Sequence, residues 1–100
     1  MSTHRNQPTW QVAECLLPGV TPAVAQALAQ RVGEEIGDSP SPEVSLLGVL
    51  LIPEDEVLLC VFTGPAGAVR AVSERAQLPL DRIVSCVGLG WPTRLEGDHT

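Results

Sequence analysis

The 100-residue sequence lacks lysine and tyrosine altogether, and it has only three aromatic side chains and two histidines. Its six basic residues, all arginine, are outnumbered by twelve acidic ones, which gives a net charge of −6 at pH 7. An acidic chain without a basic cluster repels nucleic-acid phosphates and anionic membrane surfaces, so neither is an expected partner. The avoidance of lysine and tyrosine beside abundant alanine, leucine, glycine and proline suggests a bacterium with a GC-rich genome.

Motifs for catalysis, phosphate binding and export are also missing. Residues 64–67, Gly-Pro-Ala-Gly, lack the lysine and the spacing of a phosphate-binding loop. His4 and His99 lie near the two ends of the chain, so no serine–histidine–aspartate set can be assembled. Residues 1–8 lack the apolar core of a signal peptide, and Pro53 interrupts the longest apolar stretch. These absences favour a cytoplasmic protein that is not an enzyme.

The three cysteines, Cys15, Cys60 and Cys86, are an odd number, and no disulfide framework is expected in a reducing compartment. Their spacing matches neither a zinc ribbon nor a redox motif. The favoured interpretation is that they are small buried hydrophobes. A soft-metal or redox site, the alternative, would need at least two of them on one face of a sheet.

Apolar residues at intervals of three and four predict two helices, each opened by a hydroxyl residue followed closely by proline. The first helix covers residues 22–36, and the second opens at residues 63–65 and carries its apolar stripe over residues 68–76. Four β-rich runs complete the pattern at residues 10–17, 43–52, 57–62 and 82–89.

The resulting order, β-α-β-β-α-β, predicts an α+β ferredoxin-like fold with a four-stranded antiparallel sheet. Right-handed crossovers put both helices on one face of that sheet. We expect a single domain over residues 10–90, between an N-terminal tail of residues 1–9 and a C-terminal tail of residues 91–100.

The predicted hairpin, which turns at residues 53–56, is apolar on both faces. Pairing of Ile52 with Val57 produces the pairs Leu50/Leu59 and Gly48/Val61 on one face, and Leu51/Leu58, Val49/Cys60 and Leu47/Phe62 on the other. The helices can cover only one of these faces. We therefore expect a homodimer through the second face, with a small apolar ligand in the cleft beside the partner. A mildly apolar face left in water is the alternative.

The segments 18–21, 58–62, 65–72 and 78–84, taken in order and spacing, resemble a family of small bacterial ferredoxin-like proteins of unassigned function. Some members of that family bind nickel, and the resemblance covers residues 10–89. It implies a dimer, and for some members a nickel site built from histidines on the first strand and the helices. At the first-strand position this chain has Glu14, its predicted helices contain no histidine, and Thr63-Gly64 replaces a glutamate common in the family.

Glu14, Cys60 and Phe62 are the candidate ligand-binding residues, and Glu14 is also the candidate metal ligand. A carboxylate in an apolar strand either pairs with an arginine near the sheet margin or serves in binding or acid–base chemistry. Alternation along the strand puts Glu14 and Cys15 on opposite faces, so the two cannot share a site.

The two tails are expected to meet, because the first strand starts where the last one ends. Two imidazoles there, His4 and His99, could bind nickel or zinc, although chain ends are usually mobile. Trp10 and Trp91 flank the same two strands and are expected to pack together.

Three functions remain open on the sequence. The preferred one is non-catalytic binding of a metal or a small ligand. The second is a cofactor-free dimeric α+β barrel enzyme of the monooxygenase, cyclase or isomerase type, which rests on fold analogy. The third is a purely structural oligomerisation module.

Overall fold

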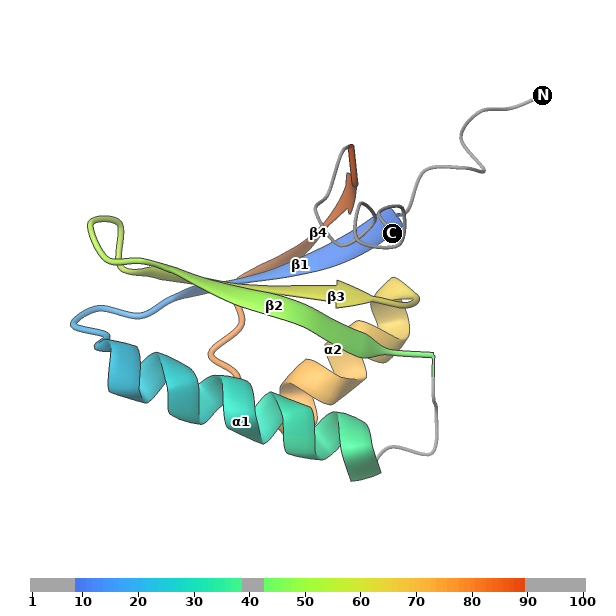
Figure 1. Ribbon diagram of the computed structural model, residues 1–100, viewed down its shortest axis with the longest axis horizontal. Helices are drawn as coiled ribbons and strands as arrows, with labels where there is room; N and C mark the ends of the chain where they lie inside the picture. The colour runs from blue at the N-terminus through green and yellow to red at the C-terminus, as the bar shows by residue number, and fades with distance from the viewer. Residues whose placement is uncertain (1–8, 39–42, 90–100) are drawn as a thin grey trace, which may run out of the picture.

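The six elements follow one another in the predicted order, and the ferredoxin-like architecture is confirmed. The computed structural model describes residues 9–38 and 43–89, shown in colour in Figure 1. The elements are β1 (Thr9–Leu16), α1 (Pro22–Asp38), β2 (Ser45–Ile52), β3 (Val57–Thr63), α2 (Ala66–Arg75) and β4 (Arg82–Val87). His4, His99 and Trp91, singled out above, lie outside the described residues.

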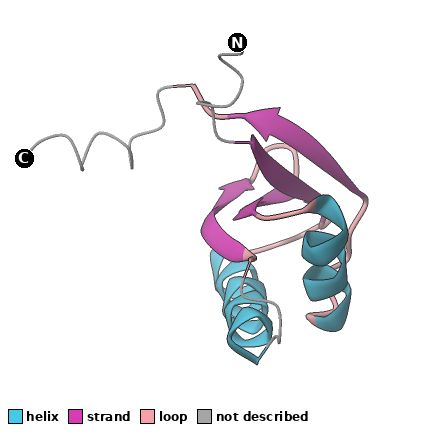
Figure 2. Cartoon of the chain, turned by 90° about the vertical axis from the view of Figure 1, so that its right-hand side faces the viewer, coloured by secondary structure: helices cyan, strands magenta, loops and turns pink. Residues whose placement is uncertain are grey.

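The sheet has the strand order β2-β3-β1-β4, and every neighbouring pair is antiparallel. Both helices pack against the same face, as Figure 2 shows, so the fold has one layer of helix and one of sheet. The core lies between these layers. Its fully buried side chains come from β1, β3 and both helices: Ala13, Cys15, Leu58, Cys60, Phe62, Val32 and Val69.

Local signals in the sequence account for the helix ends. Thr21 Oγ1 accepts a hydrogen bond from the Val24 amide at 3.2 Å, and Pro22 occupies the first helical position of α1. At the end of α2, Gln77 adopts a left-handed conformation with φ of 61°. The Gln77 amide donates to Glu74 O and the Leu78 amide to Ser73 O, each at 3.0 Å, which together form a Schellman motif.

Arg31 joins the two helices at this point. Its Nε and Nη2 donate to the Ala76 carbonyl at 3.0 and 2.8 Å, and Nη2 also reaches the Gln77 carbonyl at 3.1 Å. These carbonyls follow the last turn of α2, where a cation is favoured by the helix dipole. The contact fixes α1 against the end of α2 beneath the sheet.

The predicted hairpin register is confirmed from Ile52/Val57 through Gly48/Val61. The predicted pair of Leu47 with Phe62 is wrong, because a β-bulge between Leu46 and Gly48 places Leu46 opposite Phe62. An extra residue in one strand shifts the register by one from that point on. Uninterrupted alternation, which the prediction assumed, therefore ends at the bulge.

Candidate functional site

The face of the sheet opposite the helices, called the open face below, carries mainly apolar side chains from all four strands. The strand registers arrange them in rows. The three central rows are Arg82, Glu14, Leu59 and Leu50; then Val84, Val12, Val61 and Gly48; then Cys86, Trp10, Thr63 and Ser45. Only one row contains charged groups, and these lie at its β4 end.

A cleft of about 370 Å³ lies on this face. It is lined by Trp10, Val12, Leu50, Leu59, Val61, Cys86, Val87, Gly88 and Leu89. Leu50 and Leu89 at its rim are 54% and 74% exposed, whereas Trp10 and Val61 on its floor are only 7% exposed. The floor is thus already sheltered, while the rim presents large apolar side chains to solvent.

Gly88 allows the chain to pass close to the floor of the cleft after β4. A Cβ atom at this position would come within 2.5 Å of the Trp10 ring. No other residue could occupy the position without moving the indole or the backbone. This close approach brings Val87 and Leu89 to the cleft as one of its walls.

Glu14 and Arg82 face each other across β1 and β4 at the margin of the cleft. Arg82 Nε donates to Glu14 Oε1 at 2.7 Å, and Nη2 donates to Oε2 at 3.4 Å. The hydrogen bond and the charge of Glu14 raise the pKa of Arg82. Of the two alternatives for Glu14 drawn from the sequence, the structure shows the arginine pair, and the two charges neutralise each other.

Asp81 fixes the backbone on which this ion pair depends. Its carboxylate accepts a hydrogen bond from the Leu16 amide, and its own amide donates to the Glu14 carbonyl at 2.8 Å. Both contacts tie the start of β4 to the end of β1. Arg82 is consequently held directly opposite Glu14.

The structure does not bring the three candidate ligand-binding residues together. Glu14 lies on the open face, whereas Cys60 and Phe62 are fully buried on the helix side of β3. The predicted separation of Glu14 and Cys15 is confirmed, since Cys15 belongs to the same buried cluster. Glu14 lies at the margin of the cleft. The β1 residues that line the cleft are instead Val12 and Trp10, which alternate with Glu14 along the strand and share its face.

Cys15 and Cys60 lie on neighbouring strands in the core, as free thiols with no exposed surface. Burial raises the pKa of Cys15 to about 11, with a contribution from the charge of Asp81. Burial also raises the pKa of Cys60 to about 12, with Cys15 contributing. Because the thiolate is the nucleophile and the metal ligand, both residues are inert at neutral pH. Cys86, by contrast, lines the cleft on the open face.

A nickel site of the kind implied by the family resemblance does not fit the described residues. Within residues 9–38 and 43–89, no group of three or more histidine, cysteine, aspartate or glutamate side chains could hold a metal ion. The carboxylate of Glu14, the candidate ligand, is engaged by Arg82. Within the described residues, Glu14 is therefore not available as a metal ligand while this ion pair is formed.

No family model matches the sequence, and no curated protein does. Among solved structures, the crystal structure of SCO4226 from Streptomyces coelicolor A3(2) is similar, with a TM-score of 0.64 and 22% sequence identity. The match covers 75% of this chain and 91% of that one. It establishes the fold alone. Among the described residues, neither helix is both long enough and apolar enough to cross a bilayer.

Proposed function

We propose that this protein is a non-catalytic homodimer that holds a small, uncharged, apolar molecule between its open face and the partner subunit. The observation that carries the proposal is the apolar cleft over Trp10, Val12 and Val61. Its volume of about 370 Å³ falls within the range of roughly 300–1,000 Å³ that is usual for small-molecule sites.

The charges on the open face support the choice of an uncharged ligand. Glu14 and Arg82 are the charged pair beside the cleft, and each is already satisfied by the other. A charged ligand would have to separate them or be buried without a partner, and an unpaired buried charge is costly. Apolar surface removed from water gains about 25 cal/mol per Å². An apolar molecule is therefore the ligand that this cleft stabilises.

The chemistry of the lining supports binding over catalysis. General acid–base catalysis needs a titratable side chain within hydrogen-bond reach of the reacting atom. The described lining residues are apolar apart from the thiol of Cys86. Glu14, the nearest carboxylate, is held in its ion pair at the margin.

The size of the open face supports a second copy of the chain as its cover. With strands of six to eight residues, a four-stranded sheet spans a face of roughly 20 by 25 Å, from spacings of about 4.8 Å between strands and 3.3 Å per residue. Two such faces give on the order of 1,000 Å², which is the lower bound for a specific interface. A two-fold axis would set the same apolar rows against each other, as self-complementary interfaces require.

The test is a fluorescence titration with N-phenyl-1-naphthylamine, an uncharged apolar probe. We expect saturable binding to the wild-type protein. The substitution Cys86→Phe fills the cleft and should weaken binding at least about tenfold, a difference of about 1.4 kcal/mol. Val24→Phe, at an exposed position of α1, is the matched control and should bind as the wild type does. Absence of saturable binding, or equal affinity of the two variants, would refute the proposed site.

A further inference from the structure

The outer edge of β2 is an unusual edge strand. β2 pairs with β3 on one side and has no strand on the other within the described part of the chain. Its sequence, Ser-Leu-Leu-Gly-Val-Leu-Leu-Ile, contains neither a charged residue nor proline. Natural proteins normally protect an edge of this length with such residues, because its unpaired backbone groups invite another strand. The opposite edge, β4, is shorter and begins with Arg82.

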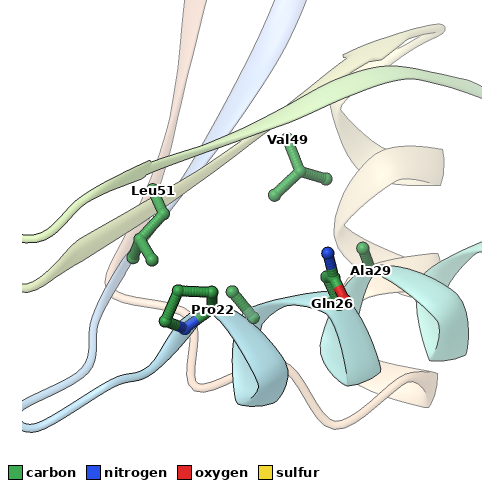
Figure 3. Close-up of a pocket in the computed structure, with 6 residues that line it drawn as sticks. Pro22, Gln26, Ala29, Val49 and Leu51 are labelled. Atoms are coloured by element: carbon green, nitrogen blue, oxygen red, sulfur yellow. The ribbon is translucent and has the colours of Figure 1, made fainter.

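A groove runs beside this edge, between β2 and the first half of α1. Figure 3 shows Val49 and Leu51 of β2 above Pro22, Gln26 and Ala29 of α1. The space they enclose measures about 200 Å³. A cavity of about 150 Å³ lined by apolar side chains accepts a benzene ring, so the groove has room for an apolar side chain. Small residues on α1 are what keep the groove open.

The charges beyond the groove are acidic in both directions. Glu54 and Asp55 lie in the turn at the end of β2, and Glu34 and Asp38 lie in the last turns of α1, on the side of the molecule where β2 starts (Figure 1). Within the described residues, arginines are found only on the second half of α1, on α2 and on β4. The guanidinium of Arg31 on α1 is directed to carbonyls that follow α2.

This charge distribution argues against a second copy of the chain at the edge. Two β2 strands paired antiparallel with full overlap would bring Glu54 and Asp55 of each copy to the acidic end of α1 in the other. Like charges placed opposite one another are destabilising. A segment with basic residues beyond both ends would be attracted instead.

We propose that the β2 edge binds an extended segment of another protein as a fifth strand. The segment places an apolar side chain in the groove over Ala29 and Val49, and it carries arginine or lysine at both ends. Backbone hydrogen bonds to the edge supply affinity, and the groove and the acidic ends supply specificity. This surface is separate from the open face, so the ligand site proposed above neither requires nor excludes it.

Three dye-labelled peptides test the proposal by fluorescence anisotropy. The first has the sequence Arg-Arg-Val-Thr-Val-Leu-Val-Thr-Arg-Arg, the second replaces every arginine with glutamate, and the third is the basic peptide N-methylated at alternate residues. We expect the basic peptide to bind at least about tenfold tighter than the other two at low salt. Because salt screens exposed charges, its advantage over the acidic peptide should shrink as the ionic strength rises.

Two matched variants locate the binding site. Ala29→Leu fills the groove and should weaken binding of the basic peptide at least about tenfold, whereas Ala27→Leu, on the exposed side of the same helix, should leave it unchanged. Equal affinity for basic and acidic peptides, or for the N-methylated one, would overturn the proposal, as would wild-type affinity in Ala29→Leu. A tetramer that Val49→Lys converts to a dimer would assign the edge to a second copy instead.

Discussion

The burial of Cys15 and Cys60 predicts how the stability of the protein depends on pH, because the chain has no lysine or tyrosine. With no lysine and no tyrosine in the chain, cysteine is the side chain that loses a proton between pH 8 and 11. In the folded protein the pKa of Cys15 is raised to about 11 and that of Cys60 to about 12, both chiefly by burial. In the unfolded chain both thiols ionise near 9.0.

We therefore predict that the protein loses stability as the pH rises above about 9. Between about pH 9 and 11 the unfolded state binds fewer protons than the folded state, so the free energy of unfolding falls by about 1.4 kcal/mol per pH unit for each thiol. Urea unfolding at pH 7, 9 and 10 measures this fall. In Cys60→Ala the slope should be about half as steep, and a wild-type slope in that variant would exclude the thiols as its cause.

Glu14 illustrates what could be inferred about single residues from the sequence. That a carboxylate in an apolar strand needs a partner follows from solvation alone, and the partner proved to be Arg82. Strand alternation also placed Cys15 correctly on the other face. Trp10 and Val12 could have been found by the same two-residue step from Glu14. Cys86, Val87 and Leu89 could not, because the sequence places the last strand beside the first but gives neither the register of that pair nor the close approach of the chain to Trp10 at Gly88.

At the scale of the elements, Gly64 links the end of β3 to the start of α2. It adopts a φ of +119°, which residues with a side chain rarely do. A Cβ there would lie 2.7 Å from the Glu43 carbonyl oxygen and 3.2 Å from Val44, just before β2. Gly33, on the exposed side of α1, has no atom within 4 Å of its Cβ position.

These two glycines predict opposite effects of the same substitution. Gly64→Ala should lower stability by about 1–3 kcal/mol from backbone strain, and by more if the contact with the Glu43 carbonyl cannot relax. Gly33→Ala should raise stability by up to about 1 kcal/mol, because alanine is the better helix former. Thermal unfolding followed by circular dichroism measures both. Destabilisation by Gly33→Ala, or none by Gly64→Ala, would contradict the local geometry of these two glycines.

Helices and strands were predictable where local chemistry decides them. The sequence predicts α1 to within two residues of its observed end at Asp38. The signals are the cap at Thr21, the proline at position 22 and the apolar stripe of the helix. The bulge at Leu47 was not predictable, since alternation continues without a break through the leucines around it. The left-handed conformation of Gln77 was not predictable either, because glycine or asparagine usually adopts it.

At the scale of the whole molecule, two helices cover one face of a sheet that is apolar on both. The helix side is closed around Phe62, Leu58 and Cys60, which have no exposed surface. On the open face, Leu50 is 54% exposed at the rim of an apolar cleft. The two-sided apolar hairpin was visible in the sequence, but the shape of the cleft was not, because it arises where all four strands and the chain after β4 meet.

A second subunit at the open face is central to the proposed function, and sedimentation equilibrium tests for it. The wild-type protein should sediment with about twice the 10.6 kDa mass of one chain. Leu50→Asp, which places a charge on the open face, should sediment as a single chain. Val24→Asp, at a position 49% exposed on α1, is the matched control and should remain a dimer. A wild-type protein that sediments as a single chain at every concentration would contradict the proposed dimer.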